Sequence, residues 1–170
     1  IPIEKSLFRE EFIQAVESDI ALLKGIYTDW FESDDVGEDP KYNTISKKIS
    51  KLLHENSKRK IVVFSSFADT ASYVKDKLTA DGFRVLVYTG GASQLDRSVV
   101  KSNFDASCKA SEQANDFDII VATDALSEGF NLNRAGVIIN YDIPYNPTRV
   151  VQRIGRINRI NRKMFDQISI

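Results

Sequence analysis

The sequence has very few of the residues that usually build covalent or metal-bound frameworks. Its 170 residues include one cysteine, Cys108, and one histidine, His54. A single cysteine cannot form an internal disulfide and is typical of a reducing compartment, so we expect a cytoplasmic protein. One histidine and one cysteine supply too few ligands for a zinc site, and we expect no metal site of that kind. No apolar run approaches the roughly 20 residues that span a bilayer, and the first residues do not resemble a signal peptide.

The sequence also lacks the short motifs of several enzyme classes. It contains no Walker A glycine loop and no GxGxxG, HExxH, GxSxG or CxxC pattern. The loop that would cradle a nucleoside triphosphate, and the acid pair that would hold its magnesium ion, are therefore not identified. These absences count against a small-ligand α/β enzyme, which stays as one alternative.

Charge is nearly balanced but unevenly distributed along the chain. The formal net charge is −1, and the acid-rich first 40 residues contain only three basic residues. Arginines concentrate near the other end. A basic segment on a near-neutral protein favours a local anion site over a general polycation.

Hydrophobic periodicity predicts alternating strands and helices after an initial helical segment. We expect helices within residues 1–30, 42–55, 66–80, 94–104 and 147–159, and strands at 61–65, 84–88, 117–122 and 137–140, with a short turn or helix at 125–132 and loops at 31–40 and 107–116. Residues 167–170 are expected to begin a fifth strand that the chain end cuts short. Strand–helix alternation predicts an α/β fold with a parallel sheet flanked by helices.

Local signals predict where three of these helices begin and where one of them ends. Ser66, with Asp69 three residues later, is expected to cap the helix after the first strand, and Ser93 the helix at 94–104. The pair at 81–82, Asp-Gly, is expected to end the helix before it. Asn146 is a good N-cap and is followed by proline at the first helical position.

The last of these helices carries a row of arginines. Val150, Ile154 and Ile157 recur at helical spacing and predict one buried stripe, while Arg149, Arg153, Arg156 and Arg159 lie beside it. No acid lies between residues 142 and 166. One interpretation is a solvated basic face or a set of salt bridges to the rest of the fold. The other is anion recognition, because guanidinium groups match phosphate oxygens.

The carboxyl ends of the predicted strands are rich in hydroxyl residues and glycine. They comprise Ser65-Ser66, Thr89-Gly90-Gly91, Thr123-Asp124 and Tyr141-Asp142. Ligands of parallel sheets bind beyond these ends, where hydroxyls and free N–H groups can hold phosphates. Ordinary turn chemistry would also account for this composition.

Four stretches in order resemble the second RecA-like domain of superfamily 2 helicases and translocases. Residues 61–66 are similar to motif IV, 89–97 to the glycine and QxxR segment, 119–132 to motif V, and 152–159 to motif VI. Residues 57–170 are therefore interpreted as a C-terminal helicase domain. Residues 1–56 match no motif and are interpreted as a helical linker or accessory segment, with a family-specific insertion or a partner-binding surface as alternatives.

The resemblance implies an ATP site shared between two RecA-like domains. The first domain, which this chain lacks, would hold most of the ATP and Mg²⁺. Arg156 and Arg159 would be the arginine fingers, with Gln152, Gly129 and Asn131 at the ATP interface, whereas Arg153 would pack or pair structurally. The residues implied to face the nucleic acid backbone are Ser66, Gly90, Gly91, Gln94, Arg97 and Thr123. Such contacts position a backbone without reading sequence.

Two departures indicate the branch of the superfamily. Gln152 and Asn131 stand where DEAD-box proteins have histidine and aspartate, and the sequence is more similar to Swi/Snf-like DNA translocases and their bacterial relatives. The resemblance thus implies double-stranded DNA as partner and an isolated chain with negligible ATP hydrolysis. A non-catalytic nucleic-acid-binding module and an RNA helicase lobe remain alternatives.

Overall fold

The computed structural model describes residues 9–31, 39–91, 93–127 and 129–157. Contacts divide the chain into two compact units, residues 1–43 and 44–170, and the boundary falls inside helix α2 (Pro40–Glu55). Each unit is described by itself. Arg159 and the expected strand at 167–170 lie outside the described residues.

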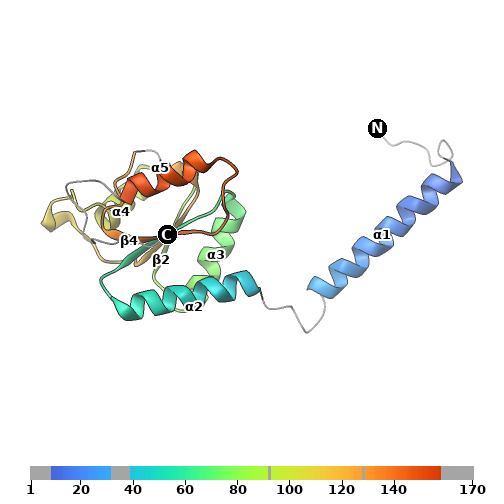
Figure 1. Cartoon of the computed structure of the whole chain (residues 1–170), viewed down its shortest axis with the longest axis horizontal. Coiled ribbons are helices and arrows are strands. Elements are labelled where there is room, and N and C mark those ends of the chain that lie inside the picture. Colours follow the sequence, from blue (N-terminus) through green and yellow to red (C-terminus); the bar gives the residue numbers. More distant parts are fainter. Residues whose placement is uncertain (1–8, 32–38, 92, 128, 158–170) are drawn as a thin grey trace. The chain divides into compact units, whose positions relative to one another are not determined.

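The larger unit is built on a four-stranded parallel sheet (Figure 1). Its strands are β1 (Lys60–Phe64), β2 (Val85–Tyr88), β3 (Ile119–Ala122) and β4 (Ala135–Asn140), in the order β2-β3-β1-β4. In the centre, Val63 lies opposite Val121 on one side and Ile139 on the other. Every residue of β1 is buried, as its continuous apolar run predicts for a central strand. The expected parallel α/β fold is confirmed.

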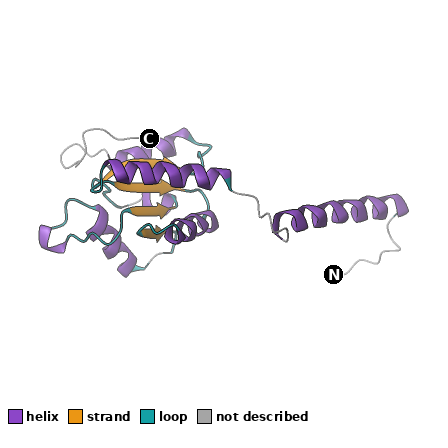
Figure 2. Ribbon diagram, turned by 90° about the horizontal axis from the view of Figure 1, so that it is seen from below, coloured by secondary structure: helices purple, strands orange, loops and turns teal. Residues whose placement is uncertain are grey.

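Helices cover both faces of this sheet. Figure 1 shows α4 (Gln94–Phe104) and α5 (Pro147–Ile157) on one side, and α2 and α3 (Ala68–Ala80) on the other. Figure 2 views the sheet from the α2 side, with α2 in front of the strands. Two short 3-10 helices, η2 (Ala110–Glu112) and η3 (Asp124–Ser127), lie before and after β3.

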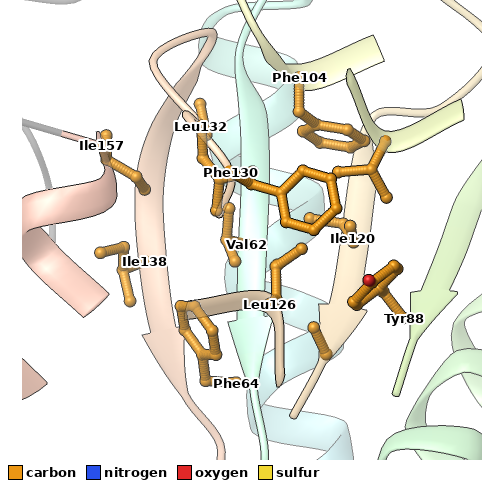
Figure 3. Packing of buried hydrophobic residues seen from close by; sticks show 13 residues of the cluster. Val62, Phe64, Tyr88, Phe104, Ile120, Leu126, Phe130, Leu132, Ile138 and Ile157 are labelled. Carbon is orange, nitrogen blue, oxygen red and sulfur yellow. The ribbon is translucent and has the colours of Figure 1, made fainter. Parts of the chain in front are cut away.

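The main core fills the space between the sheet and the α4–α5 layer (Figure 3). Val62, Ile120 and Ile138 project from adjacent strands into this cluster, where Phe104 of α4 and Ile157 of α5 meet them. All five side chains are at most 1% exposed. Burying an aliphatic or aromatic side chain of this size stabilises a fold by about 1.5–3 kcal/mol. This packing fixes α5 against the sheet, and so sets the position of the arginines.

Three of the predicted helix signals are confirmed. Ser93 caps α4 through a reciprocal capping box with Asp96. Asn146 Oδ1 accepts a hydrogen bond of 2.9 Å from Thr148 N–H at the start of α5. Helix α3 ends at Ala80, and Asp81 is its C-cap. Gly82 follows with a φ of +88°, a conformation that residues with a side chain disfavour.

The prediction that Ser66 caps α3 was wrong. The N-cap is Phe67, which makes no side-chain capping bond. Instead the Phe67 N–H donates to Ser65 Oγ over 3.2 Å, and Ser65 Oγ in turn donates to Asp142 Oδ2 over 2.6 Å. Ser65, and not Ser66, accepts the hydrogen bond from the backbone at the start of α3, because Asp142 at the end of β4 orients the Ser65 hydroxyl.

Helix α1 (Glu10–Phe31) belongs to the smaller unit. Its apolar side chains recur at helical spacing as predicted, yet Val16, Ile20, Leu23 and Trp30 are between 38% and 69% exposed. Among the described residues, no helix is long and apolar enough to cross a membrane.

Candidate nucleotide and nucleic acid interface

The carboxyl ends of the strands meet at one edge of the sheet, where side chains link neighbouring strands. Asp142, just after β4, accepts hydrogen bonds from the Ser65 hydroxyl at 2.6 Å and from the Ser66 N–H at 3.3 Å. Ser65 is completely buried, whereas Ser66 is exposed at the edge. The Ser66 hydroxyl can therefore face a ligand while its backbone is held in place.

Asp124, just after β3, is the acidic centre of the site. Its Oδ2 accepts a 2.8 Å hydrogen bond from Arg149 Nη1, and its Oδ1 accepts one of 2.8 Å from Arg153 Nε. The Asp124 side chain is 26% exposed, the Arg149 side chain 56%, and the Arg153 side chain is fully buried. One carboxylate is thus shared by two of the cations of α5.

Arg153 is enclosed on every side. Its Nη1 donates to Asn140 Oδ1 over 2.6 Å, and its guanidinium lies over the Phe64 ring at 4.7 Å from the ring centre. Its Nη2 lies 2.8 Å from Asp124 Oδ1 as an ion pair, without the alignment of a hydrogen bond. A buried charge persists only when it is paired and bonded in this way. The structural role that the resemblance implied for Arg153 agrees with these contacts.

Arg156 differs from both of these arginines. Its side chain is half-buried, and within the described ranges it forms neither an ion pair nor a hydrogen bond. Gln152, one turn earlier, is exposed. The salt-bridge interpretation of the arginine row therefore holds for Arg149 and Arg153, and within the described ranges it does not hold for Arg156.

The segment that precedes β4 is tied to the end of the arginine helix. The Leu132 N–H donates to the Arg156 carbonyl over 3.0 Å, so the half-buried Asn131 lies next to the last turn of α5. Gly129 is exposed and has a φ of +88°, a backbone conformation that suits glycine. The structure thus places the backbone next to Asn131 beside the last turn of α5.

The residues predicted to face nucleic acid are spread along the same strand-end region. Gly90 and Gly91 follow β2, Thr123 follows β3, and Gln94 and Arg97 occupy the first turns of α4. The two glycines and both α4 side chains are exposed, and Thr123 is half-buried. The sheet order therefore places Thr123 between the β2 end and the Ser65-Ser66 end.

A carboxylate modulates the charge at the start of α4. The Ser93 hydroxyl, and after it the Ser93 backbone N–H, donates to Asp96 and lowers the pKa of that carboxyl. Asp96 therefore stays ionised at neutral pH one residue before Arg97.

Sequence reasoning did not assign a role to Asp124, Asn140 or Asp142. Asp124 and Asp142 were visible as acids at strand ends, and a strand-end acid facing an arginine-rich helix is the signal that could have identified Asp124. Asn140 carried no such signal. No group of three or more His, Cys, Asp and Glu side chains in the described part of the chain could hold a metal ion.

A parallel sheet covered by helices on both faces, with its polar site at the strand ends and an arginine helix above them, defines a RecA-like domain. The chain belongs to the helicase conserved C-terminal domain family, which it matches over residues 44–161. The superfamily 2 helicase resemblance is thereby confirmed, and the domain is a helicase lobe.

Known proteins of several helicase branches are similar to this chain. The uncharacterized ATP-dependent helicase YqhH of Bacillus subtilis is 31% identical over 104 residues, which are 61% of this chain and 17% of YqhH. The RNA polymerase-associated protein RapA of Vibrio campbellii is 28% identical over 145 residues, 83% of this chain and 14% of RapA. The ATP-dependent RNA helicase eIF4A of Phaeosphaeria nodorum is 30% identical over 126 residues, 74% of this chain and 29% of eIF4A. The chain spans less than a third of the length of these relatives.

Solved structures support the fold. The C-terminal part of the Fun30 ATPase domain aligns with a TM-score of 0.66 at 18% identity, covering 95% of this chain and 52% of that one. Domain 2 of the DEAD-box helicase Mss116p, bound to an RNA duplex, aligns with a TM-score of 0.59 at 19% identity, covering 76% of this chain and 48% of that one.

Proposed function

We propose that this chain is the second motor lobe of an ATP-dependent DNA translocase and completes an ATP site with the first RecA-like lobe of its parent protein. The observation that carries the proposal is the contrast along α5. Arg149 and Arg153 both pair with Asp124, whereas Arg156 has no acidic partner among the described residues. A guanidinium that the fold does not neutralise is available to a phosphate.

Arg156 would act as an arginine finger. Negative charge spreads over the oxygens of the transferred phosphoryl group, and a guanidinium that donates two hydrogen bonds to them stabilises this charge. Such an arginine typically raises the rate of hydrolysis by about 10³–10⁵-fold. Arg153, one turn before Arg156 and bonded to Asp124 and Asn140, fixes the position of α5 against the sheet. Arg159 is proposed as the second finger on the spacing of motif VI. The first lobe would supply the phosphate loop and the acids for Mg²⁺.

Gln152, Asn131 and Gly129 would close the nucleotide side of the interface. The Leu132–Arg156 hydrogen bond supports this assignment, because it keeps Asn131 beside the arginine turn. An exposed amide at Gln152 can donate to a phosphate or ribose oxygen as well as accept from a partner N–H.

The strand-end residues would hold the nucleic acid backbone. Ser66, Gly90, Gly91, Thr123, Gln94 and Arg97 offer hydroxyls, N–H groups, an amide and one guanidinium, which suit phosphate contacts. Double-stranded DNA is proposed as the partner because Gln152 and Asn131 depart from the DEAD-box pattern. An RNA helicase lobe is the second candidate, favoured by the 30% identity to an eIF4A named as an RNA helicase.

ATPase rates test the proposal directly. We expect negligible turnover from the isolated chain, with or without duplex DNA, and DNA-stimulated turnover once the first lobe is present. Arg156→Ala should abolish this turnover while keeping DNA binding, and Arg84→Ala, a surface arginine paired with Asp118, serves as the matched control. Robust turnover by the chain alone would overturn the shared site. Stimulation by RNA but not by DNA would select the RNA lobe.

A further inference from the structure

A second basic surface lies on α2, on the opposite face of the sheet from the arginine helix. Lys47, Lys48 and Lys51 are exposed on the outer side of α2, and His54 continues the row formed by Lys47 and Lys51 one turn later. Spacings of four and three residues place Lys47, Lys51 and His54 on one helix face. We call Lys47, Lys51 and His54 the α2 basic row.

These lysines are not neutralised by the fold. Several other surface cations of the described chain have acidic partners, among them Arg59 with Glu55, Lys75 with Asp76, and Lys109 with Glu112. Within the same ranges, Lys47, Lys48 and Lys51 form no ion pair. An uncompensated row of cations attracts polyanions, whereas a paired row does not.

An open groove of about 730 Å³ runs beside the row. It is lined by Lys47, Lys51 and His54 of the row together with Ser46, Ser50, Glu55, Asp81 and Phe83. Of the two acids in the groove, Glu55 pairs with Arg59 at 3.5 Å, whereas Asp81 accepts a hydrogen bond of 2.6 Å from the neutral Ser46 hydroxyl and keeps its charge. With Glu55 paired to Arg59, the two lysines of the groove stand against the one further carboxylate of Asp81, and the groove keeps a small excess of positive charge.

We propose that the α2 basic row and its groove bind a nucleic acid backbone, as a contact separate from the strand-end site. Lysine ammonium groups hold phosphates as mobile point charges, and the Ser50 hydroxyl can add a neutral hydrogen bond. Phe83, half-buried on the groove wall, offers an apolar surface to sugars or bases. The inference rests on the proposed function only in taking nucleic acid as the partner, and it does not involve the arginine helix.

Salt dependence of binding tests the second contact. A labelled DNA duplex is titrated with the 170-residue chain at several salt concentrations, by fluorescence anisotropy. Removing two phosphate contacts should lower the slope of log K against log salt by about 1.8, since each contact contributes about 0.9. We expect the double variant Lys47→Gln/Lys51→Gln to show this loss, with roughly tenfold weaker binding near physiological salt.

A matched control separates a local site from net charge. The double variant Lys101→Gln/Lys109→Gln removes the same charge from α4 and the loop after it. The proposal expects binding close to wild type for this control, and retained binding for Lys47→Arg/Lys51→Arg. Equal losses in both glutamine variants would overturn it, because only net charge would then matter. Unchanged DNA binding in the α2 variant, with capture of polyglutamate by the wild type alone, would overturn it in favour of an acidic peptide.

The two proposals fail in different measurements. If the α2 inference is wrong, the salt slope of Lys47→Gln/Lys51→Gln equals that of wild type, while Arg156→Ala still abolishes turnover in the presence of the first lobe. If the shared ATP site is wrong, Arg156→Ala leaves turnover intact, while the change in salt slope stands.

Discussion

Arg153 and Asp124, 29 residues apart in sequence, meet through a hydrogen bond of 2.8 Å from Arg153 Nε to Asp124 Oδ1. The pair joins the middle of α5 to the carboxyl end of β3. Because Arg153 is fully buried, the carboxylate is what allows a charged side chain to occupy the interior. The arginine helix is thus anchored by one of its own cations.

Removing Asp124 should therefore be costly. Asp124→Ala leaves Arg153 buried without a counter-charge, and breaking a buried pair in this way costs about 3–5 kcal/mol. The free energy of unfolding measured in urea should fall by an amount in this range. Asp76→Ala, which removes the acid of the exposed Lys75–Asp76 pair, is the matched control and should cost less than about 1 kcal/mol. Similar losses in the two variants would show that Asp124 has no anchoring role.

Arg156 should behave in the opposite way. Its side chain has no polar partner among the described residues, so Arg156→Ala should change the free energy of unfolding by no more than about 0.5 kcal/mol. Its effect should appear in catalysis, as a loss of about 10³-fold or more in ATP turnover by the two-lobe protein. Arg156→Lys should not restore the rate, because an ammonium cannot form the bidentate hydrogen bonds that a guanidinium makes with phosphate oxygens. Full activity in Arg156→Ala would contradict the finger assignment.

Lys60 should make the stability depend on alkaline pH. Burial, followed by the nearby positive charge of Arg134, lowers the pKa of Lys60 to about 8, and its ammonium donates to the Phe117 carbonyl and lies over the Phe104 ring. An unfolded lysine keeps its proton up to a pKa of about 10.4. Between about pH 8 and that value the unfolded state binds more protons, so the free energy of unfolding should rise with pH.

Lys60→Met tests this pH dependence. The variant should lack the rise in stability that the wild type shows through this window, as measured by urea unfolding at a series of pH values. Lys101→Met, at an exposed position, should keep it and controls for other groups that titrate there. Parallel curves for the wild type and Lys60→Met would contradict the prediction.

The cap of the arginine helix offers a milder perturbation. Asn146→Ala removes the acceptor of the Thr148 N–H bond and should cost about 1 kcal/mol in the free energy of unfolding. Asn146→Asp should cost much less, because a carboxylate accepts the same bond and suits the positive end of the helix dipole. Thermal unfolding of the two variants measures the difference, and equal transition midpoints would show that the cap contributes nothing.

Local patterns allowed much of this fold to be predicted. The run from Ile61 to Phe64 is apolar and β-branched enough to indicate a buried strand, and Ser93 with Asp96 carries its own capping signal. Both features depend on residues within a few positions of one another. Motif VI was identified from the similarity of residues 152–159 to the family pattern, together with three other stretches in the same order.

Long-range pairing accounts for what could not be predicted. Nothing near Ser65 indicates that Asp142, 77 residues later, would take its hydroxyl and make Phe67 the N-cap. Likewise, no acid lies in the sequence around α5, and the sequence could not show that Asp124, from another element, pairs with two of its arginines. Such partners depend on which strand ends become neighbours in the sheet, and the helical period carries no information about that order.

The hydrogen bond from the Leu132 N–H to the Arg156 carbonyl has a mechanical consequence. The last turn of α5 cannot slide along its axis without losing this bond, and Arg153 and Ile157 pin the same turns to the sheet. We expect a load on the last turn of α5 to reach the segment before β4 through this bond, and β1 through the pairing of β4 with β1. We therefore expect the described part of this domain to move as one stiff body when a load acts on α5.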